Sequence, residues 1–153
     1  MEAAIPDSAA SSPGLFAFDT QNVQIFANQV IKTGVGIAIQ ASCEAPPGTT
    51  TTSGNQIRSN RIRGSDIDGI LVLARSNPDS VCTPHADRNL VETNDVEALG
   101  RLTGIHILLF PNGFNFPLTA DANVIRFNEI EGYVTPISDG GTNTVVKNNR
   151  IEP

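Results

Sequence analysis

The sequence predicts an almost all-β protein assembled from short repeated strands, and three observations support this fold class. Asn, Thr, Ile and Val are frequent beside 13 glycines and 10 prolines, and hardly any stretch has the 3.6-residue apolar rhythm of a helix. A short motif returns along the chain, and its minimal spacing is about 21 to 22 residues. Repetition on this scale indicates stacked units that bury their apolar sides against one another.

The chain has the size of one domain and a moderately negative charge. Its 153 residues carry a formal net charge of -6. Because nucleic-acid binding depends on Lys and Arg contacts to phosphates, we expect no nucleic-acid partner. No apolar run reaches the roughly 18 residues needed to cross a bilayer, so we expect no membrane insertion. The first residues lack the basic start and apolar stretch of a signal peptide.

The first repeated string is centred on an asparagine. "NQIRSNRIRG" at 55 to 64 nearly matches "NVIRFNEIEG" at 123 to 132. A β-branched residue stands three positions before the central asparagine of each copy and another stands two after it. Since alternate residues of a strand point to opposite faces, these Ile and Val residues are expected to form inward columns. The five copies are centred on Asn28, Asn60, Asn94, Asn128 and Asn149.

A second string, Gly-Ile followed by apolar residues, comes eight to ten residues after the asparagine in three copies. These copies begin at Gly36, Gly69 and Gly104, and an earlier one begins at Gly14. Three short strands per unit describe one triangular coil. The insertions all follow the Gly-Ile strand, at 41 to 54, 74 to 88 and 109 to 122, which predicts long loops on one side.

In these motifs the chain resembles the right-handed parallel β-helix proteins, namely the pectin-lyase-like superfamily and its parallel β-helix repeat relatives. The resemblance covers residues 14 to 153. It implies an all-β fold, a single-stranded right-handed parallel β-helix of about five coils with long loops on one side. It also implies an asparagine ladder, in which each asparagine makes a tight turn because it tolerates left-handed backbone. Residues 1 to 13 are expected to form an N-terminal segment or cap.

The outward residues beside the inward columns alternate in charge. Arg61 is expected beside Asp95, and Arg63 beside Glu97, one coil apart. Such alternation is typical of cross-strand pairing on a solvated face. A groove for a charged ligand is the alternative interpretation.

The outward residues of the Gly-Ile strand are instead mainly apolar. Exposed apolar stripes usually mark coverage or an interface. Three interpretations stay open: coverage by the insertions or the N-terminal segment, contact with another chain in self-association, and a sugar-binding surface. The two columns are Phe16, Ala38, Leu71 and His106, then Phe18, Gln40, Leu73 and Leu108.

Two carboxylates stand close together in "GSDIDG", just before a Gly-Ile strand. Asp66 and Asp68 could bind Ca²⁺ or share acid and base roles. Capping of their own turn is the alternative.

The second insertion ends in "CTPHADRN", which gathers a histidine, a carboxylate and an arginine. His85, Asp87 and Arg88 could form a catalytic or anion-binding group, or His85 could be an ordinary exposed loop residue. His106, on the apolar column, is either a packed histidine or a base.

The chain has two cysteines, in the first and second insertions. Because these insertions leave neighbouring coils, Cys43 and Cys82 could form a disulfide that joins the two loops. Two unpaired thiols are the alternative.

The resemblance implies a secreted or cell-surface module that binds or processes a polysaccharide. Whether the module is an enzyme stays open. An enzyme of this kind would be a polysaccharide lyase, a glycoside hydrolase or an epimerase. The alternative is a non-catalytic scaffold segment of an adhesin- or spike-like protein, in monomeric or oligomeric form. No zinc-like His/Cys spacing, phosphate-binding glycine loop or Gly-x-Ser-x-Gly motif is present, so we expect no cofactor, with Ca²⁺ the one metal considered. The candidate catalytic residues are Asp66, Asp68, His85, Asp87, Arg88 and His106.

Overall fold

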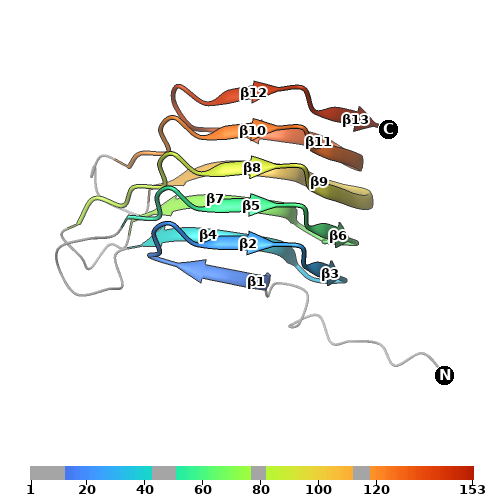
Figure 1. Cartoon of the computed structure of the whole chain (residues 1–153), viewed down its shortest axis with the longest axis horizontal. Coiled ribbons are helices and arrows are strands. Elements are labelled where there is room, and N and C mark those ends of the chain that lie inside the picture. Colours follow the sequence, from blue (N-terminus) through green and yellow to red (C-terminus); the bar gives the residue numbers. More distant parts are fainter. Residues whose placement is uncertain (1–12, 43–50, 77–81, 112–117) are drawn as a thin grey trace.

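A computed structural model of the chain describes residues 13–42, 51–76, 82–111 and 118–153 (Figure 1). These residues form strands and no helix, which confirms the all-β prediction. The described part of the chain therefore contains no helix that could cross a membrane. The strands are β1 (Pro13–Phe18), β2 (Gln24–Phe26), β3 (Gln29–Ile31), β4 (Val35–Ser42), β5 (Gln56–Arg58), β6 (Arg61–Arg63), β7 (Asp68–Arg75), β8 (Leu90–Glu92), β9 (Asp95–Phe110), β10 (Val124–Arg126), β11 (Glu129–Asp139), β12 (Val145–Lys147) and β13 (Arg150–Glu152).

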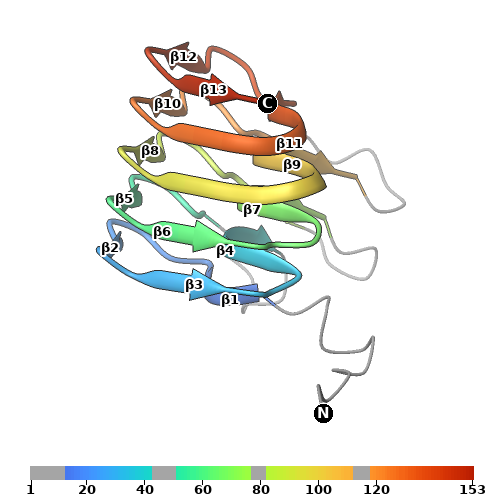
Figure 2. The same cartoon turned by 90° about the vertical axis from the view of Figure 1, so that its right-hand side faces the viewer.

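The strands form two parallel sheets. The larger sheet has eight strands in the order β1-β4-β7-β9-β11-β13, with β3 and β6 joined to it through β9. The smaller sheet has five strands in the order β12-β10-β8-β5-β2. Together they wrap into a nearly closed, barrel-like arrangement (Figure 2). This architecture is compatible with the predicted parallel β-helix.

Each strand pairs with its counterpart one repeat later, so the chain climbs in levels. The described residues form five levels, and each level contains one strand of the smaller sheet. Level 1 contains β2, β3 and β4, level 2 contains β5, β6 and β7, level 3 contains β8 and β9, level 4 contains β10 and β11, and level 5 contains β12 and β13. Strand β1 pairs with β4 from below level 1 (Figure 1).

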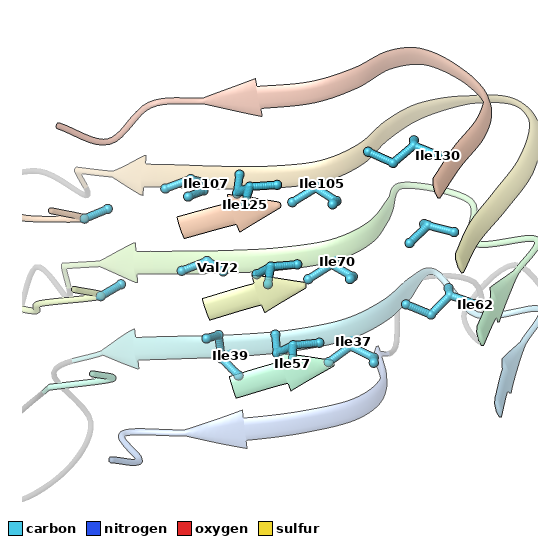
Figure 3. Close-up of a cluster of buried hydrophobic side chains, with 14 of the residues drawn as sticks. Ile37, Ile39, Ile57, Ile62, Ile70, Val72, Ile105, Ile107, Ile125 and Ile130 are labelled. Carbon is cyan, nitrogen blue, oxygen red and sulfur yellow. The ribbon is translucent and has the colours of Figure 1, made fainter. Parts of the chain in front are cut away.

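The inward Ile and Val columns form the core, as the sequence predicts. Ile57, Val91 and Ile125 stack from β5, β8 and β10, and each is at most 1% exposed. Ile70 and Ile105 stack in the same way on the larger sheet (Figure 3). β-branched side chains suit this arrangement because they pack well on a pleated surface.

Each Gly-Ile string has glycine at its first position because no side chain fits there. A Cβ atom built on Gly69 would overlap Cγ1 of Val96 and lie 2.6 Å from the carbonyl oxygen of Gly104. Gly36 and Gly104 face the same kind of obstruction, from a core methyl group and from the backbone of the next level. The close approach of successive levels at this corner therefore requires glycine.

The asparagine ladder is confirmed. Asn94 donates from Nδ2 to the Oδ1 of Asn128 at 3.0 Å and to the carbonyl of Ile57 at 2.9 Å. Its own Oδ1 accepts the backbone N–H and the Nδ2 of Asn60, both at 3.0 Å. The side-chain amides link in this way from Asn28 to Asn149.

The prediction that the asparagine itself takes the left-handed turn conformation is wrong, because the preceding residue takes it. The φ angle of that residue lies between 53° and 56° in all five copies. The left-handed residue turns the chain, and the asparagine that follows it aims its amide along the stack. The residues in this conformation are Ala27, Ser59, Thr93, Phe127 and Asn148.

A second, shorter ladder lies five residues before the first and was not predicted. Asn55 donates from Nδ2 to Asn89 Oδ1 at 3.1 Å, and the backbone N–H of Asn89 donates to Asn123 Oδ1 at 2.8 Å. The sequence holds the signal, since both strings quoted above begin with one of these asparagines. Val23 and Thr144 replace asparagine in the terminal copies, so this ladder spans only levels 2 to 4.

Cys82 is disulfide-bonded, which agrees with the predicted loop disulfide, whereas Cys43 lies outside the described residues. Residues 1 to 12 of the predicted N-terminal segment also lie outside them, as do the central parts of the three insertions.

Replacing a central ladder residue is expected to cost much more stability than replacing a terminal one. Asn94→Ala removes the acceptor of the Asn60 backbone N–H and of one Asn60 Nδ2 proton, and one donor to the Ile57 carbonyl, so the free energy of unfolding should fall by about 2–4 kcal/mol. Asn149→Ala is the matched control, because water can replace most of its hydrogen bonds at the less buried end of the ladder, and it should cost about 1 kcal/mol or less. Urea denaturation followed by circular dichroism measures both values, and equal losses would contradict the account.

Candidate functional site

The outward face of the larger sheet carries the two columns that the sequence identifies as an apolar stripe, and we call this surface the outer stripe. Burial along it is uneven. Ala38 and Leu73 are buried, Phe16 is 51% exposed, and Leu71, His106 and Leu108 are half-buried. The outer stripe is therefore partly open to solvent.

His106 forms the central polar contact of this face. Its Nδ1 lies 3.2 Å from Oδ1 of Asp68 on the neighbouring level. The Asp68 side chain is 6% exposed and that of His106 is 22% exposed. If Nδ1 donates its proton to the carboxylate, Nε2 becomes the free proton acceptor of the ring. Asp68 thus orients a partly exposed histidine.

Asp66 pairs with a residue that was not among the predicted candidates. Its Oδ1 lies 3.0 Å from a guanidinium nitrogen of Arg101, and both side chains are more than one-third exposed. The same β7–β9 register brings Asp68 opposite Thr103, so Asp66, Asp68 and Arg101 lie at one corner of the sheet. The two predicted carboxylates therefore each face a cationic or titratable partner on level 3.

Ser138 also lies beside His106, from the level above. The register pairs Ser138 with His106 and His106 with Leu71. Each of the three residues follows an inward isoleucine, so they occupy one outward column. The sequence alone did not place Ser138 there, because level 4 has Pro136 where the other copies have glycine.

Tyr133 is a buried phenol behind this corner. It is 7% exposed, and no hydrogen bond to its hydroxyl is found among the described residues. Burial raises the pKa of Tyr133 to about 12. The Ser65 side chain has the next-largest effect and lowers the pKa, whereas the negative charge of Asp68 raises it. The neutral phenol is thus the form that the fold accommodates.

His85 and Asp87 form a second polar group, next to the smaller sheet. His85 Nδ1 lies 2.6 Å from Oγ1 of Thr119 and 3.8 Å from Asp87 Oδ2. The Thr119 hydroxyl donates to both carboxylate oxygens of Asp87, at 2.8 and 3.0 Å. The backbone N–H of Asp121 donates to Asp87 Oδ1 at 2.7 Å. Asp87 is thereby held by groups from the next level.

Arg88 has a different role from His85 and Asp87. It is the left-handed residue of a turn, with φ 55°, and its backbone N–H donates to the carbonyl of Asp121 at 2.8 Å. Hydrogen bonds from Asn143 and Thr142 hold the pKa of Asp121 below its usual value, and the charge of Arg88 adds a smaller effect. Arg88 acts here through its backbone and its charge.

The six predicted residues therefore fall into two groups. Asp68 contacts His106, with Asp66 and Arg101 beside them, and Asp87 contacts His85 through Thr119. Across the described ranges, no hydrogen bond or ion pair connects the two groups. Sequence reasoning missed Arg101, Thr119 and Ser138, which become neighbours only through the register of successive levels.

The exterior charge columns pair as predicted. Arg63 makes a bidentate contact with Asp95, at 2.8 and 2.7 Å, and its Nε lies 2.8 Å from Glu97. On the smaller sheet Arg126 contacts Glu92 at 2.8 Å. Since these charges are already matched, the charge columns favour a salt-bridged exterior over a groove for a charged ligand.

No protein-family model, curated protein or solved structure matches the chain. Among the described residues, no group of three or more His, Cys, Asp or Glu side chains could hold a metal ion.

Tyr133→Phe is expected to remove an alkaline loss of stability. The folded pKa of about 12 exceeds the ordinary value of 10.0, so the unfolded chain ionises first and the stability contribution is lost as the pH rises between them. The variant should unfold at the same urea concentration as the parent, or a higher one, at neutral pH, because the buried hydroxyl has no hydrogen bond to lose.

The chain suits this experiment because it contains one tyrosine and no tryptophan, so tyrosinate absorbance reports Tyr133 alone. A midpoint near 10 in the folded protein, or strong destabilisation of the Phe variant at neutral pH, would contradict the buried neutral phenol.

Proposed function

We propose that the chain is a right-handed parallel β-helix of about five coils that serves as a secreted or cell-surface module and binds or processes a polysaccharide. Support for the architecture comes from the all-parallel pairing of successive levels and the asparagine ladder. The disulfide at Cys82 supports an oxidising, extracellular location.

The observation that carries the proposal is the His106–Asp68 pair on the outer stripe. A carboxylate that accepts the Nδ1 proton leaves Nε2 able to take a proton from a sugar, or to return one. Asp66 and Arg101, both partly exposed, lie at the same corner and can interact with hydroxyl or carboxylate groups. This arrangement suits a base in a lyase, a hydrolase or an epimerase.

Apolar and aromatic groups on the same face support carbohydrate binding. Phe16 is 51% exposed and packs against Phe18 with ring centroids 5.7 Å apart. Phe110, 47% exposed, lies under the guanidinium of Arg75 at 5.8 Å. A largely apolar surface with a few oriented polar groups is the usual composition of a small-molecule or saccharide site.

A non-catalytic scaffold, of the adhesin or spike type, is the second candidate. The charge columns favour it, because Arg63 and Arg126 are satisfied by acidic neighbours and stabilise the stack itself. In that case the stacked levels themselves provide the function, as a rigid scaffold, and the His106–Asp68 pair only stabilises the fold.

A polysaccharide screen with two histidine variants distinguishes these candidates. The purified chain is incubated with uronic-acid and neutral polysaccharides, and binding, unsaturated-product absorbance and reducing ends are measured. His106→Gln should lower any turnover by about 100-fold or more, because proton transfer contributes on that order. His85→Gln reports on the second polar group.

A loss of turnover in the His85 variant alone would show that the active site is the His85–Asp87 group and not the His106–Asp68 pair. Binding without turnover would leave a carbohydrate-binding module and exclude the enzyme. Neither binding nor turnover with any polysaccharide would favour the scaffold.

A further inference from the structure

A carboxylate, a histidine and a serine come together on three successive levels of the larger sheet. Strands β7, β9 and β11 lie one above another in this order (Figure 2). Asp68 belongs to level 2, His106 to level 3 and Ser138 to level 4, and the register sets Ser138 directly beside His106. His106 therefore has a carboxylate on the level below it and a hydroxyl on the level above it.

The contact with Asp68 makes one nitrogen of His106 basic and accessible. The Nδ1 atom lies 3.2 Å from a carboxylate whose side chain is 6% exposed. A proton held on Nδ1 by this carboxylate leaves the lone pair of the ring on Nε2. The same carboxylate stabilises the imidazolium that forms when Nε2 takes a proton. Asp68 is thus a positioning residue for proton transfer at Nε2.

The Ser138 hydroxyl is able to turn toward that nitrogen. Neighbouring strands lie about 4.8 Å apart, a gap that a serine hydroxyl and an imidazole ring can close to hydrogen-bond length. Ser138 is half-buried, and the part of the chain that the structure describes contains no hydrogen bond of its Oγ. Contacts of this kind are often long in an enzyme without substrate and shorten when substrate binds.

Apolar side chains border the three polar residues. Leu71 lies below His106 in the same outward column, and Leu108 lies two positions further along β9 on the same face. Leu73, which is 8% exposed, stands in register with Leu108. Burial of methylene groups on such a surface is favourable, so the surface suits an apolar acyl group better than a charged one.

From these features we infer that Ser138, His106 and Asp68 form a nucleophilic group that hydrolyses esters of apolar carboxylic acids. The order carboxylate, histidine, serine along the stack matches the order of roles in serine hydrolases. The inference rests on the proposed function, because it uses the same His106–Asp68 pair. Within that function, the alcohol of the ester is a hydroxyl group of the polysaccharide.

The reaction takes place in two steps. Ser138 Oγ bonds to the ester carbonyl carbon while its proton passes to Nε2 of His106. The bond from this carbon to the alcohol oxygen then breaks, and the alcohol leaves with the proton from His106. In the second step water gives a proton to His106 and bonds to the carbonyl carbon of the acyl-serine. The carboxylic acid leaves, and the proton on His106 returns to Ser138.

A fluorophosphonate probe with an alkyl chain tests the nucleophile directly. Ser138 Oγ bonds to phosphorus, fluoride leaves, and the serine proton passes to His106. Mass spectrometry of peptides should locate the label on Ser138 and not on Ser59, an exposed serine in a turn of level 2. His106→Gln should slow labelling by about 100-fold or more, whereas Ser59→Ala should leave the rate unchanged.

Hydrolysis of p-nitrophenyl esters tests the acyl group and the role of Asp68. From acetate to butyrate, kcat/KM should rise about threefold to fourfold per methylene, because each buried methylene adds to binding. Ser138→Ala should lower turnover by about 1,000-fold or more. Asp68→Asn should lower kcat by about 100-fold or more with KM unchanged. Urea midpoints of the variants identify any loss that comes from unfolding.

The outcomes separate this inference from the proposed function. If polysaccharide turnover requires His106 but not Ser138, and the probe leaves Ser138 unlabelled, His106 is a general base, so the proposed function stands and the inference is wrong. If Ser138 is labelled and esters are cleaved while no polysaccharide binds, the inference stands and the polysaccharide proposal is wrong. Absence of both labelling and ester hydrolysis would overturn the inference, whatever the polysaccharide screen shows.

Discussion

The rest of the structure depends on the buried side-chain amides that connect one level to the next. Each central asparagine uses Oδ1 for two donors of the level below and Nδ2 for a carbonyl below and an amide above. Such a network stabilises only when all its members are satisfied, because a buried amide without partners is costly. The ladder therefore fixes the register, since a slip by one residue would leave its groups unpaired and turn the Ile columns outward.

Register in turn determines every other feature of the molecule. It stacks the β-branched columns into the core and brings Arg63 between Asp95 and Glu97. It also carries Asp68 to His106 across a separation of 38 residues. A site in this architecture is not a sequence motif but a column, and its residues come from the same position in successive repeats.

This explains how much could be predicted from the sequence. The inward columns and the long Asn28-to-Asn149 ladder repeat at every level, so an alignment of the chain with itself reveals them. The Asn55 ladder was missed because it has only three members. Ser138 was missed because level 4 has Pro136 in place of the glycine and contains a register shift between Glu131 and Tyr133. Arg101 was missed because it lies between the repeated strings and not within one. Irregular levels are where the repeat stops predicting neighbours.

The wrong prediction that the ladder asparagines take the left-handed turn conformation has a related physical origin. Asparagine tolerates left-handed backbone, and this favours placing it in the turn itself. Here its amide is needed for the ladder, so residues as different as Ala27 and Phe127 take the positive φ angle instead. The tertiary hydrogen bonds outweigh the local backbone preference.

The measurement that tests the central claim most directly is hydrogen exchange of the asparagine side-chain amides, followed by nuclear magnetic resonance. The Nδ2 protons of Asn60, Asn94 and Asn128 should exchange only through opening of the stack and at a common slow rate. Those of Asn148, which is exposed and lies outside the ladder, should exchange at nearly the rate of a free amide. If the ladder amides exchange as fast as that of Asn148, the asparagine ladder does not hold the levels together.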